Sequence, residues 1–412
     1  MATIRPFKAV RPRPDVAHRI AALPYDVYNT EEALAEIKKE PLSFLKIDRA
    51  ETQFAPGIDP YDTKVYEKAR EILRNMIQEG LFIQDDRRCY YIYELIMDGR
   101  SQTGIVGCAS IDDYLNDIIK KHEKTRADKE LDRINHVDIC DAQTGPIFLV
   151  YRSQQVINEL LQKIKEETYL YNFCSPDGVR HIIWKIDRPD DIETIYSAFQ
   201  ALPSIYIADG HHRAASAVKV GLKRREANPN YNGEEEFNYF LSVLFPDDQV
   251  RIYDYNRVVK DLNGYTVEGF LQEISHAFNV EKIGSEAFKP TAKGTFGMFL
   301  DGVWYKLTAK EEIRSDDPVE GLDVSLLQNH LLKPVLNVQD PRTDKRIDFV
   351  GGIRGLKELE RRVATDMKVA FSMYPTTIEE LFAVADAGLL MPPKSTWFEP
   401  KLRSGLFIHE LK

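Results

Sequence analysis

Short apolar runs alternate with amphipathic stretches along most of the chain, which predicts a mixed α+β fold. The helical period is clearest from residue 61 to residue 79, where the apolar positions form one stripe that Gly80 ends. Further helices are predicted at residues 31–39 with Thr30 as the N-cap, 156–167, 191–200, 267–278, 324–332 and 377–387. Strands are predicted at residues 89–97, 104–111, 146–151, 179–186, 204–208, 239–245, 250–259 and in a hairpin at 294–307.

A chain of 412 residues is long enough for two or three domains, although its boundaries are weakly marked. We expect a phosphate-binding domain at residues 1–230 and a second α+β unit at residues 231–315. Residues 316–412 are expected to form a helical segment and a tail that completes the site. This tail is rich in proline and aromatic residues, which favours a segment docked on the body of the protein.

Charge and cysteine content exclude several classes of protein. The formal net charge is −10, which disfavours general binding to nucleic acid. The four cysteines include no Cys-x-x-Cys pair, so a zinc ribbon or a thioredoxin-type motif is excluded. The N-terminus lacks the apolar stretch of a signal peptide, and no apolar run approaches the length of about 18 residues that a membrane span needs. We therefore expect a soluble, cytoplasmic protein.

The most informative motif is Asp209-Gly210-His211-His212-Arg213, at the end of a β-branched strand and the start of a helix rich in small residues. Helix-start N–H groups and the helix dipole favour an anion such as phosphate, and Arg213 could add a bidentate contact. The two histidines could donate hydrogen bonds or move protons. Asp209 would suit a Mg²⁺ ion that bridges its carboxylate to phosphate oxygens. The alternative is an ordinary helix cap with a surface ion pair.

Two other stretches carry candidate chemistry. Glu123 lies beside His122 in a strongly basic run, which would keep its carboxylate ionised and able to deprotonate a hydroxyl. The alternative is a solvated, charged helix face. In the tail, Lys394, Ser395 and Thr396 could line a pocket for a carboxylate or a phosphate, or could belong to a structural clasp.

In this order, His122-Glu123, Asp209 to Arg213 and Pro393 to Thr396 resemble motifs of the free serine kinases in the ParB/sulfiredoxin-like superfamily. Over nearly its whole length the chain is similar to domain-of-unknown-function family 1015, notably at residues 24–27 and 122–125 and in the tail. The resemblance implies a ParB/sulfiredoxin-like core with large insertions. At the sulfiredoxin cysteine position this chain has His211, which argues against sulfiredoxin chemistry.

The resemblance also implies a function, namely transfer of a phosphoryl group from ATP, ADP or pyrophosphate to free L-serine, giving O-phospho-L-serine. Glu123, paired with His122, would be the general base, and residues 209–213 would hold the donor phosphates with Mg²⁺. The partner would be a small molecule, and neither nucleic acid nor a membrane is expected. Two alternatives stay open, a phosphoserine phosphatase and a ParB-like nucleotide-dependent DNA-binding regulator. The net charge and the lack of a clear helix-turn-helix argue against the second.

Overall fold

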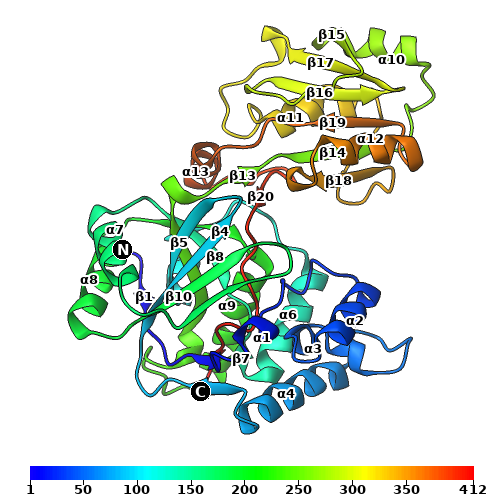
Figure 1. Ribbon diagram of the computed structural model, residues 1–412. Coiled ribbons are helices and arrows are strands. Elements are labelled where there is room, and N and C mark those ends of the chain that lie inside the picture. The colour runs from blue at the N-terminus through cyan, green and yellow to red at the C-terminus, as the bar shows by residue number, and fades with distance from the viewer. The chain divides into compact units, whose positions relative to one another are not determined.

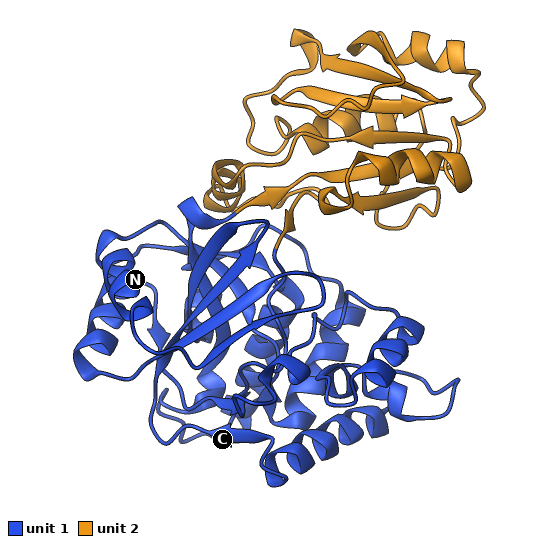
Figure 2. Ribbon diagram, in the orientation of Figure 1, with its two compact units in different colours: residues 1–250, 400–412 blue, residues 251–399 orange.

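The computed structural model describes all 412 residues, and the chain divides into two compact units (Figures 1 and 2). Unit 1 contains residues 1–250 and 400–412, and unit 2 contains residues 251–399. The division differs from the boundaries expected near residues 230 and 315. One reason is that β12 (Tyr239–Pro246), which the sequence placed in the second unit, pairs with strands of unit 1 on both sides.

Unit 1 is built on a nine-stranded mixed sheet in the order β6-β11-β8-β12-β5-β4-β10-β9, with β1 paired to β5. Its other strands are β1 (Ile4–Arg5), β4 (Tyr90–Met97), β5 (Arg100–Ser110), β6 (Ile119–Lys120), β8 (Ile147–Tyr151), β9 (Tyr171–Cys174), β10 (Arg180–Ile186) and β11 (Ile205–Asp209). The pairs β6–β11 and β8–β12 are parallel, and the other pairs are antiparallel. The central strands are buried along nearly their whole length, as the continuous apolar runs predicted.

Nine helices belong to unit 1. They are α1 (Ala17–Ile20), α2 (Thr30–Lys39), α3 (Leu45–Asp48), α4 (Thr63–Gln78), α5 (Ile111–Leu115), α6 (Ala127–Cys140), α7 (Gln155–Lys165), α8 (Pro189–Gln200) and α9 (His211–Ala227). The largest hydrophobic core joins apolar residues of the sheet to those of α7, α8 and α9. A second core lies under α4 and includes Ile408 of the tail.

The end of the chain, residues 400–412, belongs to unit 1, whereas residues 391–399 of the expected tail belong to unit 2. Within unit 1, Leu406, Phe407 and Ile408 are fully buried. A short strand of the tail, β21 (His409–Glu410), pairs with β7 (Ala142–Gln143), and the pair β2 (Val10–Pro12) and β3 (Phe82–Gln84) lies apart from the main sheet. The last residues of the chain are therefore built into the same unit as the first.

Unit 2 has a six-stranded antiparallel sheet in the order β15-β17-β16-β19-β14-β18 and a separate pair, β13–β20. Its strands are β13 (Ile252–Tyr253), β14 (Tyr255–Val259), β15 (Phe278–Gly284), β16 (Thr295–Leu300), β17 (Val303–Ala309), β18 (Ile347–Gly351), β19 (Val369–Ser372) and β20 (Trp397–Phe398). Its helices are α10 (Val267–Ile274), α11 (Asp323–Leu327), α12 (Leu356–Thr365) and α13 (Ile378–Asp386). None of the helices in the chain has the length and apolarity needed to cross a bilayer.

Local turn chemistry explains where the predicted elements begin and end. The hairpin turns at Asp98-Gly99 and Asp301-Gly302 have positive φ at both residues, which suits Asp-Gly. The predicted N-cap of α2 was wrong by one residue. Asn29 caps the helix by accepting from the Glu32 backbone N–H at 2.9 Å, and the Glu32 side chain accepts from the Asn29 N–H in return.

Candidate functional site

The turn between β11 and α9 has the form that the Asp-Gly-His-His-Arg motif predicted. The β11 register shifts between Ile207 and Asp209, which leaves a bulge where the strand ends. Gly210 is the N-cap of α9 with φ 93° and ψ 29°, and a Cβ there would lie 3.1 Å from the Arg213 Nε. No side chain caps the helix. The first N–H groups of a 17-residue helix are therefore placed to receive an anion.

Asp209 is held as a carboxylate by two cations. The Lys401 Nζ and an Arg213 guanidinium nitrogen lie 3.5 Å and 3.8 Å from its Oδ2. Burial by itself would raise the pKa of Asp209, but the positive charges of Lys401 and Arg213 outweigh it and lower this pKa to about 2. Lys401 lies in the Pro- and aromatic-rich tail, but no motif in the sequence marks this particular lysine.

Arg213 is more constrained than a bidentate phosphate ligand would be. Its side chain is 14% exposed, and NH1 donates a hydrogen bond to the backbone carbonyl of Pro146, before β8. One branch of the guanidinium is thus already used, which leaves part of the group for a ligand. This contact also connects the start of α9 to the start of strand β8.

Two buried histidines lie beside this turn, and one of them lacks a hydrogen-bond partner. The rings of His122 and His211 pack edge to face, with centroids 4.5 Å apart. The Nε2 of His211 has no hydrogen-bond partner. Burial lowers the pKa of His122 to about 4 and that of His211 well below its usual value. Both rings are therefore neutral near pH 7, and such buried, unpartnered polar atoms are rare in folded proteins.

Glu123 lies in the loop between β6 and α6, since α6 begins only at Ala127. The alternative of a solvated helix face is therefore wrong. The Glu123 side chain is 46% exposed, and its Oε2 is 3.8 Å from the His211 Nδ1. Two lysines of the basic run, Lys120 and Lys121, contact Asp117. The structure thus brings Glu123 to the start of α9, although the motifs are far apart in the sequence.

His212 ties the two motifs together. Its Nε2 accepts a hydrogen bond of 3.0 Å from the backbone N–H of Arg126, in the loop that carries Glu123. The backbone carbonyl of His212 accepts a hydrogen bond of 2.6 Å from the Ser216 hydroxyl within α9. This arrangement gives His212 a positioning role for the loop.

Lys394, Ser395 and Thr396 belong to unit 2, whereas the other candidate residues belong to unit 1. Lys394 has a positive φ of 60°, and its Nζ lies 5.7 Å from the centre of the Tyr255 ring. Its backbone carbonyl accepts a hydrogen bond of 3.0 Å from the buried Arg257 guanidinium, which forms no ion pair with a carboxylate. One buried arginine thus contacts the backbone of this segment, and the role of the segment in substrate binding stays a prediction.

The start of α9 offers a single carboxylate, Asp209, as a ligand for a metal ion. No three or more His, Cys, Asp and Glu side chains are arranged as a metal cage. Mg²⁺ in phosphoryl-transfer sites, however, usually takes one or two carboxylates together with substrate phosphates. Asp209, ionised and next to the anion-binding helix start, fits that requirement as a single ligand.

The fold and the site together define a mixed α+β protein with a candidate phosphate-binding turn. The chain belongs to the family described as "Protein of unknown function (DUF1015)", whose sequence model matches residues 4–325. No curated protein matches the chain.

Solved structures with a similar arrangement include a glutamate-to-alanine mutant of free serine kinase in complex with ADP. It has 15% identity and a TM-score of 0.35, covering 74% of this chain and 92% of that one. SbnI with a C-terminal truncation from Staphylococcus aureus has 11% identity and a TM-score of 0.39, covering 71% and 82%. A conserved hypothetical protein from Pyrococcus furiosus has 16% identity and a TM-score of 0.35, covering 74% and 94%.

Proposed function

We propose that the chain is a small-molecule kinase that transfers a phosphoryl group from a nucleotide or pyrophosphate to free L-serine, giving O-phospho-L-serine. The observation that carries this proposal is the placement of the Glu123 carboxylate. It is partly open to solvent and lies next to neutral His211, at a helix start that also has an ionised aspartate and two cations. Serine as the acceptor rests on the resemblance of the three motifs to those of free serine kinases.

Phosphoryl transfer requires mainly positioning and neutralisation of charge, and the start of α9 offers both. The free N–H groups of the helix would hold donor phosphate oxygens, and Arg213 and Lys401 would add positive charge. Bound through Asp209, Mg²⁺ would neutralise negative charge that builds up on the phosphate oxygens.

Glu123 would hold the serine hydroxyl and take its proton as the hydroxyl oxygen attacks the terminal phosphorus. A new O–P bond forms, the bond to the donor's bridging oxygen breaks, and the remaining donor leaves with that electron pair. Because His211 is neutral, it donates or accepts a hydrogen bond without adding a positive charge that would weaken the carboxylate as a base. His122, behind the His211 ring, would fix the orientation of that ring.

The test is phosphorus NMR on the purified protein with Mg²⁺ and L-serine, in which ATP, ADP and pyrophosphate are supplied one at a time. We expect a phosphoserine signal with one of these donors. If none gives the signal but added phosphoserine releases inorganic phosphate without any acceptor amino acid, Glu123 activates water instead and the protein is a phosphatase. The half-exposed carboxylate suits either nucleophile, so this second function is the one to exclude.

A further inference from the structure

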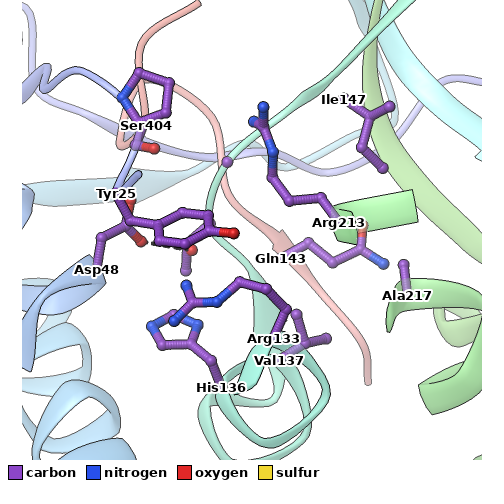
Figure 3. A pocket seen from close by; sticks show the side chains of 13 residues that line it. Tyr25, Asp48, Arg133, His136, Val137, Gln143, Ile147, Arg213, Ala217 and Ser404 are labelled. Atoms are coloured by element: carbon purple, nitrogen blue, oxygen red, sulfur yellow. Dashed lines mark hydrogen bonds between the residues drawn. The ribbon is translucent and has the colours of Figure 1, made fainter. Parts of the chain in front are cut away.

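A cavity lies in unit 1 and is lined by residues of the helices α6 and α9, Arg133 and Arg213 among them (Figure 3). It spans about 470 Å³ of space between atoms, a figure that includes open solvent. Its lining comes from the N-terminal loop, α3, α6, the segment before β8, α9 and the tail, so segments from the whole length of unit 1 meet there.

The cavity contains a buried carboxylate with no cation of its own. Asp48 is 5% exposed and accepts a hydrogen bond of 3.0 Å from the Thr144 hydroxyl, but it forms no ion pair. His136 also lines the cavity and is too poor a base to provide the missing charge, because burial lowers its pKa to about 4. Arg133 interacts electrostatically with Asp48 but forms no ion pair with it, so a ligand cation would give this buried carboxylate a direct partner.

The same cavity contains a buried guanidinium. Arg133 is 7% exposed, and its Nε donates a hydrogen bond of 2.9 Å to Asp132, which lies outside the cavity lining. The Tyr25 ring covers one face of the guanidinium at 4.0 Å. In Figure 3 the Arg133 side chain lies under the Tyr25 ring, and Asp48 approaches from a different side. Thus Asp48 and Arg133 line one cavity without pairing with each other.

Arg213 connects this cavity to the candidate phosphate site. It lines the cavity, and its guanidinium also lies 3.8 Å from the Asp209 carboxylate. A molecule held in the cavity would therefore have one end close to the group that we propose to hold donor phosphates.

We propose that this cavity is the acceptor pocket and that it binds an α-amino acid as a zwitterion, with Asp48 binding the ammonium group and Arg133 the carboxylate. The assignment rests on the proposed kinase function and adds to it the recognition of the acceptor. A zwitterion supplies a cation to Asp48 and a second carboxylate to Arg133, beside Asp132, at once, whereas an amine or an acid alone can contact only one of the two. The remaining part of the ligand, the side-chain hydroxyl of serine, is then free to lie at the Arg213 end.

A ligand series on the unaltered protein tests this assignment without any change to the fold. Titration calorimetry would compare L-serine with ethanolamine, which lacks the carboxylate, and with 3-hydroxypropionate, which lacks the amine. Each lost charge-assisted hydrogen bond should weaken binding by about tenfold to a hundredfold. If either analogue binds as tightly as L-serine, the zwitterion assignment is wrong.

A variant then tests the assigned residue. Asp48→Asn should weaken L-serine binding by about tenfold to a hundredfold while nucleotide affinity stays the same, because the nucleotide is placed at the start of α9. The matched control is Asp138→Asn, on the surface of α6, where the aspartate pairs with Lys223 outside the cavity lining. An unchanged L-serine affinity in folded Asp48→Asn would overturn the proposal.

These outcomes separate the pocket from the proposed function. If the protein phosphorylates serine with the same KM in wild type and Asp48→Asn, the kinase stands and the pocket assignment fails. If L-serine binding depends on Asp48 but no donor yields phosphoserine, the pocket stands and the kinase fails.

Discussion

His181 and His211 are both buried in unit 1, and their surroundings differ in a way that distinguishes a structural site from the proposed functional one. Burial lowers the pKa of His181 to about 3 and that of His211 well below its usual value. The ring of His181 is fully partnered, since Nδ1 contacts the Tyr93 hydroxyl at 2.8 Å and Nε2 contacts the Ser175 hydroxyl at 2.9 Å. The Nε2 of His211 has no partner. A lowered pKa thus reports burial in both places, and only the missing partner points to a ligand.

The tail contributes a cation to each region, and the two cations are used differently. Arg403 is 4% exposed and donates to His181, Ser175 and Asp177, which closes a complete network. Lys401 lies 3.5 Å from Asp209, at the uncapped start of α9. The first cation stabilises the docking of the tail, and the second leaves the tail as part of a site that can receive an anion.

The largest effect should come from Glu123→Gln, which alters the proposed base beside His211. The amide keeps the size of the side chain but cannot accept the hydroxyl proton, so turnover should fall by about 10²- to 10⁴-fold. Donor affinity should be retained, because no donor contact is assigned to Glu123. Steady-state formation of phosphoserine and calorimetry with the nucleotide measure the two quantities.

Asp128→Asn is the matched control for that variant. Asp128 is a nearby acidic residue that is 55% exposed and pairs with Arg126, so its replacement should leave turnover within about twofold. Full activity in Glu123→Gln would remove Glu123 from the reaction and move the base elsewhere.

Arg213→Ala should weaken donor binding by about tenfold to a hundredfold, since it removes a charge-assisted contact to phosphate. Arg213→Lys should give an intermediate affinity, because a lysine keeps the charge without the planar fork. Lys223→Ala, in the exposed second half of α9, is the control and should leave donor affinity unchanged. Donor affinity equal to that of the wild type in Arg213→Ala would place the phosphates away from this turn.

Replacing a residue of the structural network around His181 should lower the free energy of unfolding. Arg403→Ala removes the ion pair with Asp177 and leaves the His181 ring with fewer partners, which should cost about 1–3 kcal/mol in the free energy of unfolding. Asp177 is 42% exposed, so water compensates part of that loss. Urea unfolding measures the change. Arg180→Ala, an exposed arginine on β10, should change it by no more than about 0.5 kcal/mol.

Much of this site could be predicted because its signals are local in the sequence. Strand β11, the glycine at its end and helix α9 follow one another directly, so Asp209 to Arg213 read as one motif. The hairpin at Asp98-Gly99 was equally clear, since its turn chemistry fixes the pairing of β4 with β5.

What the sequence could not show depends on contacts between distant segments. Lys401, Asp48 and Arg133 carry no motif, and they become candidates only when the tail and α3 pack near α6 and α9. The strand β12 was placed in the wrong unit because its apolar run does not say which sheet it joins. Helix α12 and strands β18 and β19 were not predicted for a similar reason. They are stabilised by strand pairing and core packing with other parts of unit 2.

The smallest and most discriminating effect is the pH dependence of stability. Unfolded histidine titrates near 6.5, whereas folded His181 titrates at about 3, so between these values the unfolded chain binds more protons. The free energy of unfolding therefore rises with pH between about 3 and 6.5. The same contribution is lost progressively as the pH falls below about 6.5. His181→Gln should reduce the slope of unfolding free energy against pH by about 1.4 kcal/mol per pH unit between about pH 5 and 6.

His122→Gln sharpens the comparison, because His122 has a pKa of about 4 but lacks the complete side-chain network that surrounds His181. If burial alone lowers the pKa values of His122 and His181, His122→Gln should reduce the slope of unfolding free energy against pH by the same amount as His181→Gln. The absolute stability, however, should fall more in His181→Gln, which breaks a complete network, than in His122→Gln. Urea unfolding at several pH values gives both quantities, with exposed His276→Gln as the control. An unchanged slope in His122→Gln alone would mean that His122 is protonated in the folded protein, and the neutral pair beside Glu123 would then be wrong.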